Sequence, residues 1–168
     1  MSEQNPELRE DDKKPQGVLS DVGSNPTPGA LKFRLRVFSM RCSGCGECCR
    51  ETEMELSSDD IKRLVDAGYC PEDFIIIRDG VLRLRNVDGW CYFYSRDERK
   101  CRVYGIRPLG CRLYPVVYVE GEGVALDELC PMRHTVSKGE FRRKARILKK
   151  LLEKIERERV LRQWRGTI

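Results

Sequence analysis

The chain has 168 residues, of which 35% are charged and 40% hydrophobic, and this length allows one compact domain with tails. No stretch approaches the roughly 18 consecutive apolar residues of a membrane span, and the polar, acidic N-terminus lacks the pattern of a secretory signal. We therefore expect a cytoplasmic protein with no membrane association. Residues 1–30 carry three basic groups, six acidic groups and four prolines, so we expect a disordered N-terminal tail there.

The middle of the chain, residues 31–135, has the signals of a small antiparallel sheet with short helices. Apolar residues alternate over 31–38, which predicts a strand that leads to the first cysteines. Ser57 and Asp60 form a capping-box pattern, so a helix is expected to begin there and to end at Gly68. Turn signals then predict further strands, at 74–78 and 81–85 around Asp79-Gly80, at 90–94 after Asp88-Gly89, and at 116–119 and 124–126 around 120–123.

Residues 136–168 form a basic C-terminal segment with twelve basic and four acidic groups. Ser137 and Glu140 form a second capping-box pattern, and apolar residues recur at helical spacing over 141–155, so one long amphipathic helix is expected, packed on or extending from the domain. A charge of this kind suits nucleic acid or an acidic partner. We favour a solvated face of a packed helix, because the apolar residues need burial and no aromatic platform for bases accompanies the charge.

Nine cysteines are the main feature of the sequence. In a reducing cytosol clustered thiols usually bind a metal, although the low count of three Asn and three Gln hints at a heat-loving source, where disulfides are tolerated. Residues 42–49 have the spacing C-x2-C-x2-C-C, in which Gly44 and Gly46 let the backbone curl around one centre. Bacterial-type ferredoxins use the same three-thiol run with a further cysteine before a proline, as in Cys130-Pro131 here.

The adjacent pair Cys48 and Cys49 is unusual, because neighbouring side chains diverge and rarely serve one mononuclear metal. We expect one of the two to face a second centre or to bridge. Four more cysteines follow, at Cys91, Cys101, Cys111 and Cys130. Four plus four thiols suit two four-thiolate sites, or one site with spare thiols, and tetrahedral S4 ligation suits both zinc and iron–sulfur.

These residues resemble a known family. Three stretches are similar to the CxxCxxCC cysteine-cluster family of YkgJ-type, zinc- or iron-chelating proteins: the run from Cys42 to Cys49, then Gly89-Trp90-Cys91-Tyr92-Phe93, then C-R-V-Y-x2-R-P-x2-C-R-L-Y-P over 101–115. The resemblance covers about residues 38–131 and implies eight metal-binding cysteines, namely Cys42, Cys45, Cys48, Cys49, Cys91, Cys101, Cys111 and Cys130. Flagellin lysine-N-methylase carries a similar cluster, so the resemblance also permits a methyl-transfer role.

Two arginines, the ninth cysteine and the single histidine are the remaining candidate residues. Arg107 and Arg112 bracket Cys111, and they either donate to cluster sulfurs or receive an anionic substrate, or else form structural salt bridges. Cys70 lies outside the pattern and is expected to be an ordinary buried thiol. His134, the only histidine, is expected to have a surface or hydrogen-bonded role. The sequence has no G-x-S-x-G or nucleotide-binding fingerprint.

Together these patterns predict an α+β fold with a small antiparallel sheet and short helices around a cysteine-ligated metal centre, and a long C-terminal helix. The expected cofactor is an iron–sulfur cluster, slightly preferred over zinc, with one or two centres. The expected function is a redox, metal-handling or interaction module, with an unidentified protein partner compatible with that role. The alternative is an enzyme or enzyme component that uses the cluster in methyl transfer or oxidoreduction.

Overall fold

The computed structural model describes residues 42–165. The expected tail over 1–30 and the expected strand over 31–38 lie outside the described residues. Among the described residues, no helix combines the length and the apolar character needed to cross a membrane.

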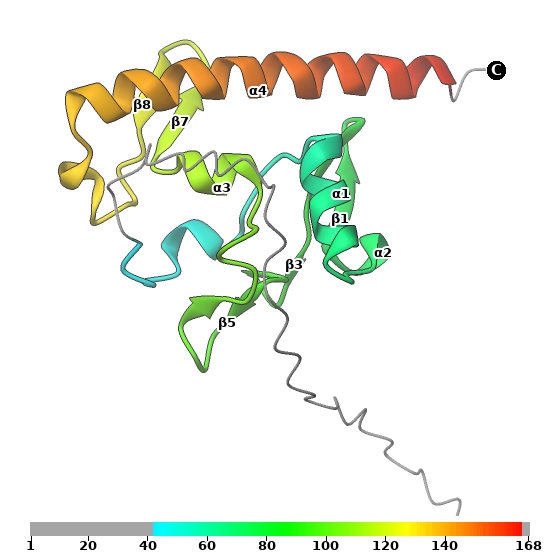
Figure 1. Ribbon diagram of the computed structural model, residues 1–168, viewed down its shortest axis with the longest axis horizontal. Helices are drawn as coiled ribbons and strands as arrows, with labels where there is room; N and C mark the ends of the chain where they lie inside the picture. The colour runs from blue at the N-terminus through cyan, green and yellow to red at the C-terminus, as the bar shows by residue number, and fades with distance from the viewer. Residues whose placement is uncertain (1–41, 166–168) are drawn as a thin grey trace, which may run out of the picture. The chain divides into compact units, whose positions relative to one another are not determined.

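The described chain is an α+β arrangement of short elements followed by one long helix, as expected (Figure 1). The helical elements are the 3-10 turns η1 (Glu47–Cys49) and η2 (Arg133–Thr135) and the helices α1 (Ser58–Asp66), α2 (Pro71–Phe74), α3 (Leu109–Leu113) and α4 (Lys138–Arg165). The strands are β1 (Ile75–Arg78), β2 (Val81–Leu84), β3 (Asn86–Val87), β4 (Trp90–Cys91), β5 (Tyr94–Ser95), β6 (Lys100–Cys101), β7 (Val116–Val119) and β8 (Gly123–Leu126).

The strands pair antiparallel two by two, as β1–β2, β3–β4, β5–β6 and β7–β8. Within residues 42–165 they therefore form four two-stranded sheets and not one continuous sheet. The strand expected over 90–94 is divided into β4 and β5, because Tyr92 and Phe93 turn the chain between them. The hairpins at Asp79-Gly80 and at 120–123 are confirmed, and Asp79 and Gly80 both have positive φ, as a two-residue hairpin turn requires.

The capping signals are also confirmed. Ser57 caps α1 in a reciprocal capping box with Asp60, and Ser137 Oγ accepts a hydrogen bond of 3.2 Å from the Glu140 N–H at the start of α4. Within α4 the buried Lys144 pairs with the buried Glu140 and donates a 3.2 Å hydrogen bond to the Tyr114 carbonyl. This contact ties α4 to the residue that follows α3.

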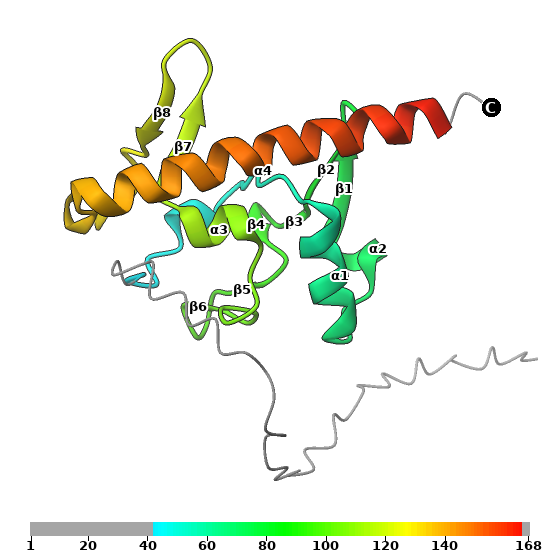
Figure 2. The same ribbon diagram turned by 45° about the horizontal axis from the view of Figure 1, so that its top comes forward.

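Two hydrophobic clusters hold the fold together. The first packs α1, α2, β2 and the chain around β4, with the buried residues Leu56, Leu64, Phe74, Leu84, Cys91, Phe93 and Val103. The second packs α4 on α3 and β7, with the buried residues Leu113, Val116, Leu148, Leu151 and Ile155. In the views of Figures 1 and 2, α4 lies beside α3, and the β7–β8 hairpin crosses α4. Segments that carry cysteines contribute to both clusters.

Candidate metal centre

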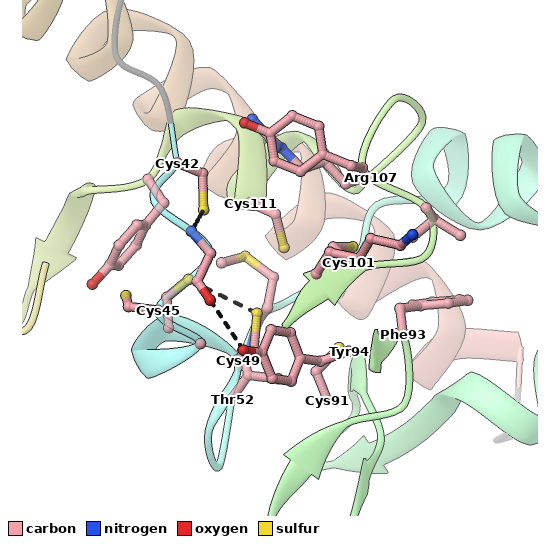
Figure 3. Close-up of a pocket in the computed structure, with 18 of the residues that line it drawn as sticks. Cys42, Cys45, Cys49, Thr52, Cys91, Phe93, Tyr94, Cys101, Arg107 and Cys111 are labelled. Atoms are coloured by element: carbon pink, nitrogen blue, oxygen red, sulfur yellow. Dashed lines mark hydrogen bonds between the residues drawn. The ribbon is translucent and has the colours of Figure 1, made fainter. Parts of the chain in front are cut away.

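All eight cysteines implied by the family resemblance line one cavity of about 410 Å³. They come from the η1 loop, β4, β6, α3 and the loop before η2, and they are Cys42, Cys45, Cys48, Cys49, Cys91, Cys101, Cys111 and Cys130. Figure 3 shows labelled members of the set around a common space. All nine cysteines are free thiols, so the structure contains no disulfide among the described residues.

The first cysteine loop closes on an aromatic pair. Trp90 and Tyr94 stack with their ring centroids 5.2 Å apart, and the Tyr94 hydroxyl donates a 3.1 Å hydrogen bond to the Gly44 carbonyl. Gly46 has a φ of +87°, and a Cβ atom there would lie 2.6 Å from the Tyr94 hydroxyl oxygen. Only glycine fits this close approach. The Gly44 N–H also donates to Cys42 Sγ at 3.4 Å, so an amide of the loop points at a thiol.

Cys48 and Cys49 differ from the expectation that their side chains diverge. Their Sγ atoms lie 4.0 Å apart and both line the same cavity. The reason is that rotation about the Cα–Cβ bonds brings neighbouring sulfurs together even where those bonds point apart. The hydrogen bond between the two sulfurs lowers the pKa of Cys48 and raises that of Cys49, because one shared proton stabilises one thiolate.

Burial is the main influence on the pKa values of the other perturbed thiols in the cavity. Burial raises the pKa of Cys91 to about 11, and burial also raises the pKa of Cys101, Cys111 and Cys130. Negative charge on neighbouring cysteine sulfurs raises these pKa values further. Isolated thiols of this kind stay protonated at neutral pH, and a bound metal cation is the group that converts them to thiolates.

Arg107 is the cation of the cavity that sequence analysis had singled out. Its guanidinium carbon lies 3.7 Å from the ring centroid of Tyr104, and its Nε is buried with no hydrogen-bond partner among the described residues. Burial dominates the raised pKa of Cys111, and the charge of Arg107 acts against that rise. Arg112, the other candidate arginine, does not line the cavity. The structure thus separates the two arginines.

A polar clamp from α1 holds the segment that carries Arg107 and Cys111. The buried carboxylate of Asp60 accepts a 2.8 Å hydrogen bond from the N–H of Leu109, the first residue of α3. Arg63 pairs with Asp60 at 2.5 Å and donates to the carbonyls of Ile106 and Arg107 at 3.0 and 3.1 Å. Sequence analysis found the capping role of Asp60 but not this clamp, because its partners lie more than 40 residues away.

Two candidates lie outside the cavity. Cys70 is exposed, so its expected burial is wrong: it precedes the one-turn helix α2, where its Sγ donates to Glu72 Oε2 at 2.8 Å. That hydrogen bond raises the pKa of the Cys70 thiol. His134 is exposed in η2 and does not line the cavity.

Several residues that line the cavity were missed by sequence reasoning. They are mainly the thioethers Met54 and Met132, the aromatic Tyr94 and the cations Arg99 and Lys100. Met54 Sδ lies 2.2 Å from where a Cβ of Gly110 would be, so a glycine in α3 makes room for it. None of these positions has a spacing that marks it in the sequence. Among the described residues, no three His, Cys, Asp or Glu side chains form a group that could hold a metal ion as they stand.

Comparison with known proteins bears on this cavity. A protein of Methanocaldococcus jannaschii that is itself described as uncharacterized is 33% identical over 89 residues, and the match covers 48% of this chain. The match covers 47% of that protein, so this chain spans about half the length of the curated relative it matches. No solved structure matches the chain.

The family comparison covers the cysteine pattern itself. The model of the CxxCxxCC family, described as a "putative zinc- or iron-chelating domain", matches residues 41–131. This range contains all eight cysteines of the cavity and more than half of the chain. The match supports zinc or iron binding, and the chain belongs to the CxxCxxCC family.

Proposed function

We propose that the protein holds an iron–sulfur cluster, with one or two centres, in the cysteine-lined cavity and acts as a redox or metal-handling module. One observation carries the proposal: eight thiols from five segments of the chain line one cavity, and no imidazole or carboxylate is among the described residues that line it. A set of soft sulfur ligands selects zinc or iron–sulfur over hard cations such as magnesium and calcium.

The size of the cavity favours a polynuclear cluster over a single zinc ion. A zinc ion lies about 2.3 Å from each of four sulfurs, which makes a compact tetrahedral site. Here the eight cysteines lie around a cavity of about 410 Å³, which is larger than one four-sulfur zinc site needs. The eight cavity cysteines would hold the cluster, and the cluster would supply one-electron redox chemistry.

The surroundings of the thiols suit such a cluster. Phe93, Val103 and Met54 line the cavity and limit the access of water. Arg107 also lines the cavity, and its buried Nε–H has no partner among the described residues, so a sulfur atom of a cluster would be an acceptor for it. Hydrogen bonds to sulfur and burial are two of the factors that set the reduction potential of an iron–sulfur cluster.

The number of thiols favours a module over an enzyme. Catalytic metal sites keep a position open for water or substrate. Eight thiols are enough to fill every protein position of two four-thiolate centres. The support for the enzyme alternative is the placement of Arg107 in the cavity, where an anionic substrate would meet it.

The test is metal and sulfide analysis of the full chain purified without oxygen, together with its visible and electron paramagnetic resonance spectra. We expect iron and acid-labile sulfide in equal amounts and a brown protein. Colourless protein with stoichiometric zinc and no iron would reject the iron–sulfur cluster and retain metal binding. Metal-free protein with nine free thiols would reject the proposal as a whole.

Single variants of the adjacent cysteines test how many centres there are. We expect Cys48→Ser and Cys49→Ser to differ in metal count or spectrum if the two sulfurs serve different centres. Identical results from both variants would contradict the two-centre form, and one of the pair would then be only a neighbouring thiol.

Arg107 and Arg112 offer a variant and a matched control for testing whether a nearby charge sets the reduction potential of the cluster. We expect Arg107→Gln to shift the reduction potential, because it removes a charge and a donor from the cavity. Arg112→Gln removes the same charge five residues away, outside the cavity lining, and is expected to leave the potential nearly unchanged. Equal shifts would mean that only the overall charge of the protein matters.

A further inference from the structure

The outer face of α4 is a second surface with an unusual distribution of charge. We define it by ten exposed residues, Arg142, Arg143, Arg146, Lys149, Lys150, Glu153, Arg157, Val160, Leu161 and Trp164. Six are cations and one is an anion. The opposite side of the helix is buried against α3 and β7 through Leu148, Leu151 and Ile155, so packing explains that side and leaves the outer face unexplained.

Most cations of this face have no carboxylate partner. Arg142, Arg146, Lys149, Lys150 and Arg157 form no salt bridge with any residue between 42 and 165. Other cations of the same helix are paired. Lys154 lies 2.5 Å from Asp59 of α1, and Arg159 lies 2.6 Å from Glu156. The unpaired cations are therefore gathered on the side that faces solvent.

This arrangement is unfavourable for the helix alone. Arg142 and Arg146, and again Arg146 and Lys150, are four residues apart, and like charges at that spacing destabilise a helix. The segment 141–152 contains no acidic residue at all. A helix that only had to pack would gain from carboxylates there, as it does at Glu156 and Glu158. An anionic ligand would remove the repulsion.

The spacing and the end of the face indicate the kind of ligand. From Arg142 to Arg157 the helix rises about 22 Å, and cations recur on nearly every turn of about 5.4 Å. Trp164 follows on the same side and is 73% exposed. Sequence analysis had found no aromatic residue associated with the charge. A row of cations with an exposed aromatic ring can contact successive phosphates and stack on a base.

We propose that the outer face of α4 binds single-stranded nucleic acid, with its arginines and lysines on phosphates and Trp164 stacked on a base. The proposal is independent of the metal centre, because none of these residues lines the cysteine cavity. An anionic membrane is less suitable as the ligand, because the main apolar stripe of α4 is buried and cannot enter lipid. An acidic protein offers no regular repeat of charge for the row to follow.

The experiment measures binding of the full chain to fluorescently labelled oligonucleotides of 15 to 20 nucleotides, as RNA, single-stranded DNA and duplex DNA, over a range of salt concentrations. About five phosphate contacts on a single strand predict a slope of about −3.5 in log K against log salt. The triple variant R142Q/R146Q/K150Q should weaken binding at least tenfold and reduce the magnitude of the slope by about 2.

A matched control removes the same net charge elsewhere. Lys62→Gln, Arg78→Gln and Arg96→Gln together replace three exposed cations outside α4, and this triple variant should bind within about threefold of the parent chain. Trp164→Ala should weaken single-strand binding about tenfold and leave duplex binding nearly unchanged. Circular dichroism melting of all variants establishes that they fold, since the substituted residues are exposed.

Each remaining outcome overturns the proposal. No binding at low salt would reject it directly. Equal losses from the α4 triple variant and from the control would show attraction by net charge alone. Tighter binding to vesicles with anionic lipid, or to an acidic polypeptide such as polyglutamate, than to either single strand would assign the face to a membrane or to a protein.

Discussion

The region around the cysteine cavity and the region built on α4 are stabilised in different ways. Around the cavity, β3–β4 and β5–β6 pair only two residues each. In the other region a helix of 28 residues packs Leu148, Leu151 and Ile155 on α3 and β7. Short pairs of strands provide little stability by themselves, whereas the buried face of a helix does. From this comparison we expect the stability of the cavity region to depend more on a bound metal than the stability of the α4 region does.

The largest expected effect comes from removing a cavity ligand. We expect Cys42→Ser or Cys45→Ser to release metal and unfold the cavity region, because metal binding of this kind contributes on the order of 10 kcal/mol. Hydrogen exchange read by mass spectrometry should show lost protection over β3–β6 and retained protection over α4 and β7. Uniform loss of protection over both regions would contradict the comparison.

A packing defect in the α4 region should lower stability there without affecting metal binding in the cavity region. Leu148 is buried, and Leu148→Ala should lower the free energy of unfolding of the α4 region by about 2–5 kcal/mol with metal content unchanged. The control is Leu161→Ala on the exposed side of the same helix, which should change stability by about 0.5 kcal/mol or less. Chemical denaturation with metal analysis of the folded fraction measures both quantities.

Breaking the clamp between α1 and α3 is expected to lower stability less than the core substitution at Leu148 does. Asp60→Asn replaces a buried carboxylate that accepts from Leu109 and Arg63, and should cost about 1–3 kcal/mol. It should also reduce metal content, since the clamp positions Cys111. Asp66→Asn is the matched control, because Asp66 is exposed and pairs only with Lys62 on the surface. Unchanged metal content in the Asp60 variant would show that α3 holds Cys111 without the clamp.

The smallest effect is expected at the cysteine outside the pattern. Cys70 is exposed and does not line the cavity, so Cys70→Ser should leave metal content unchanged and alter stability by less than about 0.5 kcal/mol. Elemental analysis beside the Cys42→Ser variant measures the difference. If both variants lost their metal equally, the distinction between pattern and non-pattern cysteines would fail.

Local signals in the sequence predicted much of the fold. The capping box of Ser57 and Asp60, the hairpin turn at Asp79-Gly80 and the long C-terminal helix are all confirmed. Each depends on residues within about four positions of one another, so the chemistry that forms it is visible in sequence order. The set of cavity cysteines was predicted from spacing and from resemblance to a family.

Only the tertiary structure decided which residues far apart in the sequence lie together. It placed Cys42 and Cys130, 88 residues apart, at one cavity, put Arg107 inside and left Arg112 outside. It also exposed Cys70, which had been expected to be an ordinary buried thiol outside the pattern. Spacing identifies which side chains are able to bind a metal, but their convergence depends on contacts such as Asp60 with Leu109, across 49 residues. Contacts at that separation form only when the whole chain packs, and for this reason the sequence determined the candidate ligands while the fold brought them to one cavity.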